Sequence, residues 1–433
     1  MTPRMISLSV DELPKRWYNI LPDLPEPLPP PKDPEHGESR IKMLPKIFIK
    51  ECLEQEFSTE RWIDIPPEVR ELFLQAGRPR PLFRAYNLEK KLKTPARLYY
   101  KAEFYSPTGS HKVNTALAQA WYAQKQGITR LTTETGAGQW GTALSYACSM
   151  AGIKCTVYWV RAVYNWKLQR KRFMMLYGSE VYASPSNNTE SGRALLKEDP
   201  NHPGSLGIAV SEGMEDAAND DKAKYSLGSV LNHVLMHQTV IGLETQSQLK
   251  IAGEEPDLLV SCLGGGSNFG GFTLPFIGDR IKKKCNARFL AVQSEVAPNL
   301  QGEYKYDFGD HAEKTPLLKM YTLGHQTKMK PIKGDGIRYH AAAPVLSLLR
   351  HHKYIDTVTY PADEKHVFDR ARMFIQTEGF LPAPESAYSI CGAIDEALRC
   401  RENKEEKCIV FNISGHGFMD MDGYNEILKL DAN

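Results

Sequence analysis

The sequence lacks several features that would point to a particular partner. None of its 433 residues belong to a run close to the ~18 apolar residues that a membrane-spanning helix needs. It also lacks an excess of one charge, since 54 Lys+Arg stand against 52 Asp+Glu. A protein that binds nucleic acid or an anionic membrane needs a concentrated basic surface. We therefore expect neither partner.

Cysteine pairs and a secretory signal are also missing. The eight cysteines are scattered without a C-x-x-C pair, and the N-terminus has no apolar core. This pattern predicts a cytoplasmic protein with free thiols, although disulfide-rich hyperthermophile proteins remain an exception. His233 and His237 stand four apart but have no acidic neighbour or third ligand, so we expect a structural helix and no metal site.

The chain is longer than one hydrophobic core usually supports, which predicts two packed units. Residues 22–34 contain seven prolines and must be extended, either as a linker or as an arm over a neighbouring surface. Strands then alternate with helices that end at glycine. The expected strands are 97–103, 131–135, 155–160, 180–183, 257–262, 288–293, 354–359 and 407–413, and the expected helices include 111–126, 139–151, 165–177 and 229–252.

This alternation predicts an α/β protein made of two doubly wound domains, with a ligand between them at the carboxyl ends of the strands. We expect a Pro-rich extension over 1–45 and an N-terminal domain over 46–228. The latter would include a mobile subdomain and a surface excursion over 184–226 with one helix. A C-terminal domain over 229–433 would follow, and strand 97–103 is a candidate member of its sheet.

Three glycines follow the expected strand 257–262, in the turn CLGGGSN, and a helix comes next. Glycines let backbone N–H groups approach a ligand closely, and a helix N-terminus adds positive potential. The turn is therefore a candidate phosphate cradle. It matches neither the dinucleotide fingerprint nor the Walker loop, and a tight turn without a ligand is the plainer interpretation.

Lys112 lies where a loop becomes a helix, in SHKVN. Burial and the positive end of a helix both disfavour the ammonium form, so its pKa should be lowered. An amine in that state can form a Schiff base. Taken alone, Lys112 is more simply a solvated charge.

Glu134 ends a strand and precedes a second glycine loop, residues 135–139 (TGAGQ). The N–H groups of this loop could hold a carboxylate, with Glu134 as general acid or base; a capping acid is the alternative. Glu385, in PAPES, begins another helix, where N-capping is the plain interpretation. Ser414, in NISGHG, follows the last strand and could hydrogen-bond a ligand ring.

The motifs HKVN, ETGAGQWG, GGGSN, PAPES and NISGHG, in this order and spacing, resemble the tryptophan synthase β chains, which are fold-type II enzymes dependent on pyridoxal 5′-phosphate (PLP). The resemblance covers roughly residues 45–430. It implies that Lys112 is the Schiff-base lysine and Glu134 the catalytic acid. The implied cofactor-binding residues are His111, Lys112, Gln139, Gly264, Gly265, Gly266, Ser267, Asn268, Glu385 and Ser414, and the implied substrate-binding residues are Thr135, Gly136, Ala137, Gly138, Gln139 and Arg338.

The implied reaction is a β-replacement that joins indole to L-serine, giving L-tryptophan. A neutral serine at the pyridine nitrogen limits carbanion lifetime and favours β-elimination over transamination. The resemblance also implies a homodimer, a monovalent cation near the site and an α chain as partner. The divergent extension suggests that the contact with the α chain is weak, transient or absent.

Several residues depart from the commoner β chains and match a second, divergent class. Trp140 replaces a histidine, and Arg338 stands where those chains carry an aspartate near the substrate hydroxyl. Ala341 departs even from the pattern of the divergent class. An arginine cannot accept a hydroxyl proton, whereas its guanidinium suits a phosphate. Arg338 could thus bind O-phosphoserine, pair with a loop acid that gates closure, or form a structural salt bridge.

Two rival functions stay open. A threonine synthase or a serine/threonine dehydratase would share the fold type and the cofactor. A non-catalytic partner subunit would keep the fold without activity, but intact Lys112, Glu134 and GGGSN argue against it. Serine turnover with and without indole, and the absorbance of bound PLP, would separate these alternatives.

Overall fold

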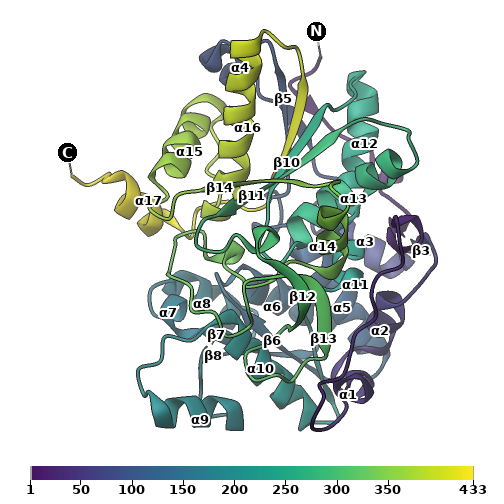
Figure 1. The fold of residues 1–433 in the computed structure, drawn as a ribbon, viewed down its shortest axis with the longest axis vertical. Helices are drawn as coiled ribbons and strands as arrows, with labels where there is room; N and C mark the ends of the chain where they lie inside the picture. Colours follow the sequence, from purple (N-terminus) through teal and green to yellow (C-terminus); the bar gives the residue numbers. More distant parts are fainter. Residues whose placement is uncertain (1, 433) are drawn as a thin grey trace.

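The computed structural model describes residues 2–432 and arranges them around two main sheets (Figure 1). The larger sheet has seven strands, of which β1 and β4 are antiparallel to their neighbours and the rest are parallel. In spatial order they are β1 (Met5–Ile6), β4 (Leu82–Arg84), β5 (Arg97–Ala102), β15 (Cys408–Ile413), β10 (Leu258–Cys262), β11 (Arg288–Ser294) and β14 (Asp356–Tyr360).

The smaller sheet is wholly parallel, and its order is β8 (Glu180–Ser184), β7 (Lys154–Val160), β6 (Arg130–Thr135) and β9 (Ala223–Tyr225). Every residue of β10 and β15 is buried, as expected for parallel strands with helices on both faces. The α/β class and the parallel sheets predicted from the sequence are thus confirmed.

Helices cover both sheets, and α9 lies at the far end of the smaller one (Figure 1). Gly152 shows how a helix is made to end: its φ of 68° allows the left-handed turn that returns the chain from α6 to β7. The helices are α1 (Arg40–Ile47), α2 (Lys50–Glu56), α3 (Pro67–Gln75), α4 (Tyr86–Leu92), α5 (Val113–Lys125), α6 (Gln139–Ala151), α7 (Arg161–Tyr164), α8 (Leu168–Leu176), α9 (Glu190–Glu198), α10 (Leu206–Ala218), α11 (Asn232–Gln238), α12 (Val240–Ala252), α13 (Ser267–Ile281), α14 (Pro344–His351), α15 (Lys365–Glu378), α16 (Pro384–Asn403) and α17 (Met421–Leu428).

The segment 184–226 differs from the surface excursion expected from its polar composition. It contains two helices, α9 and α10, and the strand β9. Helix α10 is mostly buried, and β9 completes the smaller sheet, so the segment is part of the folded core. Because several of the buried residues of α10 are small or acidic, its sequence shows no clear apolar helical pattern. The expected single helix over 229–252 is divided at Thr239, where the side chain bonds the carbonyl of Met236.

The proline-rich segment lies as an arm over a hairpin of the C-terminal part. Its backbone pairs at Lys32 with Leu317 in β13 (Leu317–Thr322), which pairs with β12 (Glu303–Phe308). The Lys32 ammonium also lies 4.2 Å from the centre of the Tyr306 ring. The sequence left open whether this segment is a linker or an arm over a neighbouring surface, and these contacts show that it is an arm. Strand β2 (Arg16–Tyr18) of the extension pairs with β3 (Trp62–Asp64).

Strand β5 belongs to the larger sheet, between β4 and β15. The domain boundaries near residues 45 and 228 stay a prediction, since the larger sheet draws strands from both ends of the chain. All eight cysteines are free, and seven of them are buried. Within residues 2–432, no helix has both the length and the apolar character required to cross a bilayer.

Candidate active site

A cavity lies where the carboxyl ends of strands from both sheets meet. Its wall contains residues that follow β5, β6, β10 and β15, and it encloses about 880 Å³ of empty space, including its open mouth. This position is where open α/β sheets bind ligands. The strand ends thus bring together segments from distant parts of the sequence, as the pairing of β5 with β15 illustrates.

Lys112 immediately precedes helix α5, and its amine contacts the carbonyl of Gly228 at 3.3 Å. Burial lowers the pKa of the amine to about 8, although the carboxylates of Glu134 and Glu385 act in the opposite direction. A lysine with this pKa is partly neutral near pH 7 and can act as a nucleophile or a base. The sequence-based expectation of a lowered pKa holds, with burial as the main cause.

Glu134, near the end of β6, lies on the same cavity wall and accepts a hydrogen bond from the hydroxyl of Tyr225. Burial raises the pKa of this carboxyl to about 7, and the bond from Tyr225 opposes the rise. A carboxyl with this pKa can both give and take a proton near neutrality.

The turn after β10 presents unpaired N–H groups to the cavity. Among the described residues, none accepts a hydrogen bond from the backbone N–H of Gly264, Gly265, Gly266 or Asn268. A Cβ at Gly265 would lie 2.4 Å from the Ser229 hydroxyl, so the turn has no room for a larger residue. With the 15-residue helix α13 behind it, the turn is a cradle for an anion.

His111 lies beside this cradle, with Nε2 3.1 Å from the Ser267 hydroxyl, and its Nδ1 has no partner among the described residues. Burial, together with the neighbouring Lys112 charge, lowers the pKa of the imidazole to about 3, so His111 is neutral. A neutral imidazole can donate one hydrogen bond to an anion held by the turn.

The loop after β6 is a second cradle. Within the described part of the chain, no acceptor meets the N–H groups of Gly136, Ala137, Gly138 or Gln139. The loop is held in place by the Trp159 indole N–H, which donates to the Gly136 carbonyl at 2.7 Å. Its position beside Lys112 and Glu134 suits the carboxylate of an amino acid.

Ser414 follows β15 and lines the same cavity. Its oxygen lies 2.8 Å from the hydroxyl of Ser386, which also accepts a bond from the backbone N–H of Gly415 at 3.0 Å. Cys262 lies nearby, with its sulfur 4.0 Å from the Ser414 oxygen. Both contacts are neutral polar groups, a hydroxyl and a thiol, so this part of the wall can bind a ring nitrogen without a full charge.

Glu385, at the start of α16, joins two other parts of the wall. Its carboxylate accepts bonds from the side chain of Gln139 at 3.2 Å and from the backbone N–H of Gly336 at 2.8 Å. Burial raises the pKa of Glu385, an effect that the nearby Lys167 charge opposes. The N-cap of α16 is Ala383 and no side chain caps this helix, so Glu385 links two parts of the wall and is not a cap.

Arg338 was expected to contact the substrate directly, and the structure places it differently. Arg338 does not line the cavity; its guanidinium is 3.0 Å from a carboxylate oxygen of Asp335 and donates to the carbonyl of Met329. Asp335 is the residue that lines the wall, and its pKa is raised by burial against the charges of Lys167, Arg338 and Lys333.

The cavity brings together most of the predicted site residues. Gly138 and Arg338 are the two that do not line it; Gly138 instead turns the chain into α6 with φ of 90°. Sequence reasoning missed Tyr225 and Asp335. Asp335 is three residues from Arg338, but no motif marks it, and Tyr225 reaches Glu134 only because β9 pairs with β6. The predicted residues on the wall are His111, Lys112, Glu134, Thr135, Gly136, Ala137, Gln139, Gly264, Gly265, Gly266, Ser267, Asn268, Glu385 and Ser414.

A second cavity adjoins the first and is predominantly apolar. The two share the wall residues Val210, Leu227, Val230 and Tyr339. The proline-rich arm and helices α1 and α2 contribute part of the remaining apolar lining. An aromatic molecule without charge would fit this environment.

The sequence is similar to known PLP enzymes over most of its length. The profile of the family described as "Pyridoxal-phosphate dependent enzyme" matches residues 73–415. A tryptophan synthase β chain 2 of Methanothermobacter thermautotrophicus is 56% identical, covering 98% of each chain. A tryptophan synthase β chain of Thermococcus gammatolerans is 57% identical, covering 96% of this chain and 94% of the relative.

Solved structures share the fold at lower sequence identity. A fungal L-serine ammonia-lyase from Rhizomucor miehei has a TM-score of 0.59 and 15% identity, covering 81% of this chain and 98% of the other. A threonine deaminase, whose source is abbreviated T.th., has a TM-score of 0.53 and 20% identity, covering 77% of this chain and 91% of the other. At these identities the likeness concerns the fold alone.

Proposed function

Because this chain belongs to the tryptophan synthase β-chain family of pyridoxal-phosphate dependent enzymes, and is thus a PLP-dependent lyase of tryptophan biosynthesis, we propose roles for its individual residues. The observation that carries these roles is the single cavity that holds the Lys112 amine, the Glu134 carboxyl and two cradles of unpaired N–H groups.

The residues of the cavity fit PLP. The turn 264–268 offers unpaired N–H groups to a phosphate, with His111 beside it, and Lys112 offers an amine to an aldehyde. Ser414 would hydrogen-bond the pyridine nitrogen. Bound PLP supplies an electron sink for charge that develops at the α-carbon of the substrate.

Proton transfers are the work of two residues. Lys112 removes the α-proton of the donor amino acid, and Glu134 gives a proton to the departing oxygen. The loop 135–139 holds the carboxylate of the donor and so fixes which bond faces Lys112. Carbon C3 of indole would then bond to the β-carbon in place of the lost oxygen, its proton would pass to the Glu134 carboxylate, and Lys112 would return a proton to the α-carbon, giving L-tryptophan and, from serine, water. Glu134 is buried and Lys112 is half-buried, so little water that would compete with indole can reach the two groups.

We propose that L-serine and O-phosphoserine are the candidate donors, and that Arg338 favours the phosphate ester. The Asp335 carboxyl on the cavity wall is surrounded by the charges of Lys167, Lys333 and Arg338. A phosphate dianion can displace a carboxyl of raised pKa from a guanidinium, because it carries more negative charge while it accepts the same two parallel hydrogen bonds as a carboxylate.

The apolar second cavity supports indole as the other substrate. Indole is uncharged, and the shared wall residues would let it pass between the two cavities without crossing bulk water. The arm residues Pro27–Pro31 would then form part of the indole-binding surface.

The proposed assembly is a homodimer with a weak or transient α-chain contact. The word "beta" in the relatives' names supports a companion chain. Free buried cysteines support the cytoplasm as location. A monovalent cation bound by backbone carbonyls remains part of the proposal. Size-exclusion chromatography with and without an α chain tests the assembly.

The decisive experiment supplies indole with L-serine or O-phosphoserine and follows tryptophan. Tryptophan formation by the parent protein and its loss in Lys112→Ala are expected. Sustained pyruvate release without tryptophan would select a serine dehydratase, the activity named in one structural neighbour. Failure of added PLP to give the visible absorbance of a lysine-bound cofactor would revive the non-catalytic alternative.

The donor is tested with Arg338→Ala. We expect kcat/KM for O-phosphoserine to fall at least about 10-fold, since a hydrogen bond to a charged group contributes about 1.5–3 kcal/mol, while the value for serine changes little. Equal losses for both donors would rule out a phosphate-binding role and leave Arg338 as the partner of Asp335.

A further inference from the structure

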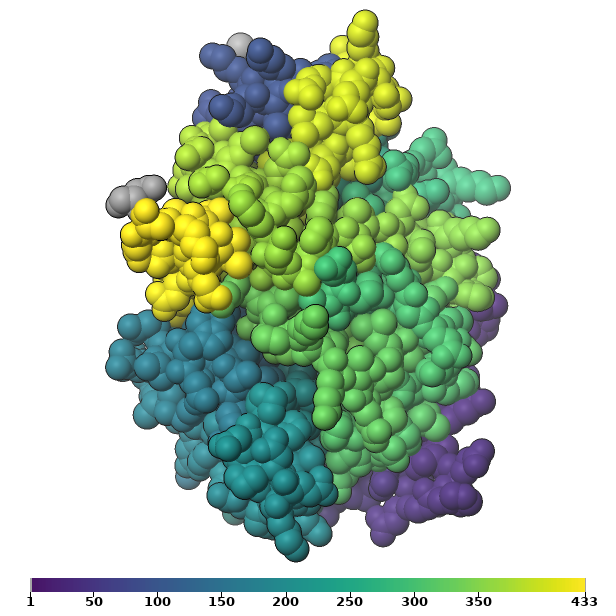
Figure 2. Space-filling view, turned by 60° about the vertical axis from the view of Figure 1, so that its left-hand side comes forward, coloured from purple at the N-terminus to yellow at the C-terminus, as the bar shows by residue number. Residues whose placement is uncertain are grey.

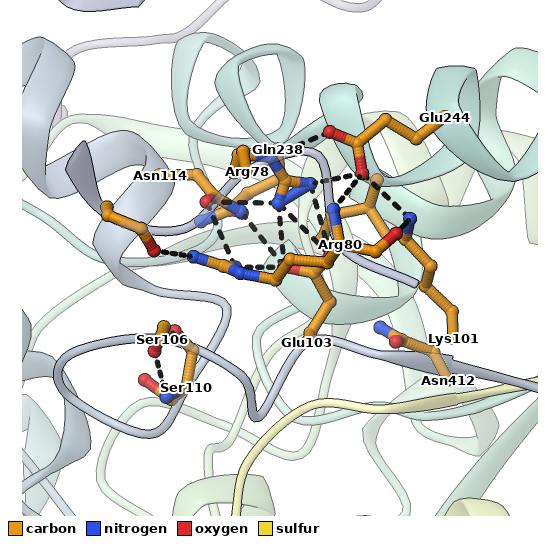
Figure 3. Close-up of polar contacts among 12 residues, drawn as sticks. Arg78, Arg80, Lys101, Glu103, Ser106, Ser110, Asn114, Gln238, Glu244 and Asn412 are labelled. Carbon is orange, nitrogen blue, oxygen red and sulfur yellow. Dashed lines mark hydrogen bonds and ion pairs between the residues drawn. The ribbon is translucent and has the colours of Figure 1, made fainter. Parts of the chain in front are cut away.

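Five charged side chains form a fully buried cluster outside the cavity (Figure 3). Arg78 and Arg80 lie between α3 and β4, Lys101 and Glu103 lie at the end of β5, and Glu244 lies in α12. Each of these side chains is 0% exposed. We refer to these residues as the buried ion cluster.

The buried ion cluster contains three cations and two anions. Arginine keeps its proton in proteins. The Lys101 amine contacts three acceptors: the Arg80 carbonyl at 2.6 Å, a Glu244 oxygen at 2.7 Å and the Gln248 side-chain oxygen at 2.9 Å. Three acceptors require three N–H donors, so the geometry fits the ammonium form. Replacing buried ion pairs by apolar residues is often neutral or stabilising, so stability alone is a weak reason for the cluster.

Glu103 connects the cluster to the helix that follows Lys112. Arg78 grips its carboxylate with both terminal nitrogens at 3.0–3.1 Å, and Arg80 donates to it at 2.6 Å. Asn114, in the first turn of α5, accepts from Arg78 at 3.3 Å and donates to Gln238 at 2.9 Å. Figure 3 shows these side chains converging from separate elements. Asn114 is two residues from Lys112.

The loop between Glu103 and Lys112 is fixed at its other end by the segment after β15. The Ser106 hydroxyl bridges the backbone of Ser110, as Figure 3 shows. The backbone N–H of His111 donates to the Ser414 carbonyl at 2.8 Å. Lys112 therefore lies between two anchors, of which one belongs to the cavity wall and the other is the buried ion cluster.

We infer that Glu103 is a positioning residue: held by Arg78 and Arg80, it fixes Asn114 and the first turn of α5, and thereby sets where Lys112 presents its amine. This inference rests on the role proposed above for Lys112. Neither Glu103 nor Asn114 lines the cavity. A displacement of about 1 Å can cost about 100-fold in rate, so a distant anchor can control the reactivity of the amine.

The test separates the reactivity of Lys112 from the binding of a phosphorylated ring. The rate at which apoprotein and PLP form the lysine-bound cofactor is followed by visible absorbance. Affinity for pyridoxamine 5′-phosphate, which has no aldehyde and cannot bond to lysine, reports the cradle and the ring contacts alone. For Glu103→Gln we expect the rate to fall about 10- to 100-fold, with affinity for the analogue within about twofold.

The chain offers a matched control at the opposite end of the same strand. Glu254 grips Arg97, at the start of β5, through two nitrogens at 2.8–3.0 Å. Glu254→Gln removes an Arg–Glu pair of the same type, with side chains 30% and 9% exposed, and should change neither measurement. Equal changes in Glu103→Gln and Glu254→Gln would overturn the inference. Parallel loss of rate and analogue affinity, or an unchanged rate, would also overturn it.

Two further variants keep the test decisive if Glu103→Gln does not fold. Arg78→Lys keeps the charge but cannot grip a carboxylate with two nitrogens, and Asn114→Ala removes the link to α5. Both should slow bond formation with little effect on analogue affinity, and unchanged rates in both would contradict the inference. Lys112→Ala is measured first: if it still gives the lysine-bound absorbance, the proposed role of Lys112 fails independently of Glu103.

Discussion

The two residues proposed to move protons are both shifted by burial toward their neutral forms. The pKa of Lys112 is lowered to about 8 and that of Glu134 is raised to about 7. Near pH 7 each residue can therefore give and take a proton, as a β-replacement requires. The hydrogen bond from Tyr225 keeps the pKa of Glu134 from rising further.

The Tyr225 hydroxyl stabilises the charged form of Glu134, and its removal has a predictable sign. In Tyr225→Phe the carboxylate loses a donor, so its pKa rises and the protonated acid persists to higher pH. The alkaline limb of kcat/KM for tryptophan formation should move upward. A pH–rate profile of parent and variant measures the shift, and a downward shift would show that Glu134 does not act as the acid in this limb.

The same profile in Glu134→Gln serves as the reference. Loss of a general acid typically costs about 100- to 10,000-fold, and the limb should disappear because glutamine does not titrate. A limb that survives with its midpoint unchanged would belong to another group.

Single residues also show what sequence can and cannot provide. The place of Lys112 in the cavity was predictable because it lies in a motif where a loop becomes a helix, and that of Glu134 and Ser414 because each lies in a motif at the end of a strand. Tyr225 and Asp335 were not, because their positions depend on which strand pairs with β6 and on how the turn at 335–337 folds. The partner that decides the role of Arg338 is three residues away, yet only coordinates show that the two side chains meet.

At the scale of elements, the site depends on turns that only glycine can form. Gly265 has Ser229 and Val230 against its α-carbon, at 2.4 and 2.9 Å from where a Cβ would stand. Because the turn packs this closely on Ser229 and Val230, its backbone stays beside the cavity with its N–H groups free to bind a ligand. The geometry explains why a glycine run, rather than a charged side chain, precedes α13.

Gly265→Ala should weaken PLP binding by about 10-fold or more, because overpacking costs about 1–3 kcal/mol and displaces the N–H groups. Equilibrium titration of the apoprotein with PLP measures the effect. Gly423→Ala is the matched control, since it lies in α17 with no contact closer than 3.6 Å. Similar PLP affinities for both variants would mean that the turn does not hold the phosphate.

Elements with strong patterns were predicted well, and those with mixed composition were not. The strands over 97–103, 257–262 and 407–413 agree with β5, β10 and β15 within one residue at each end. In contrast, α10 and β9 lie within a stretch of polar overall composition, and the buried side chains of α10 mix Ile208, Val210 and Met214 with small residues and Glu212. These two elements are stabilised by packing on the smaller sheet, and a contact of that kind cannot be predicted from the local sequence.

At the scale of the whole molecule, two buried ion pairs that share Asp420 join distant parts of the chain. Lys167, just before α8, and Arg170, within it, contact the two oxygens of Asp420 at 2.9 and 2.6 Å. Figures 1 and 2 both place the C-terminal helix α17 against the segment that contains α7 and α8. These charges also act on Glu385, so the joint lies close to the cavity.

The ion pairs of Asp420 with Lys167 and Arg170 should keep water out of the cavity. In Asp420→Asn the attraction to Lys167 and Arg170 is lost, and two cations remain buried without a full counter-charge. We expect kcat/KM for tryptophan to fall and the ratio of pyruvate to tryptophan to rise several-fold, because water gains access before indole reacts. Coupled assays for both products, with L-serine as donor, measure the ratio.

Asp369→Asn provides the control for this change. Asp369 pairs with Lys365 one turn away on the surface of α15, and exposed pairs of this kind contribute little. The ratio of products should stay at the parent value there. If Asp420→Asn keeps the parent ratio of products but has a lower melting temperature, the ion pairs of Asp420 have a purely structural role. The barrier to water would then lie elsewhere in the molecule.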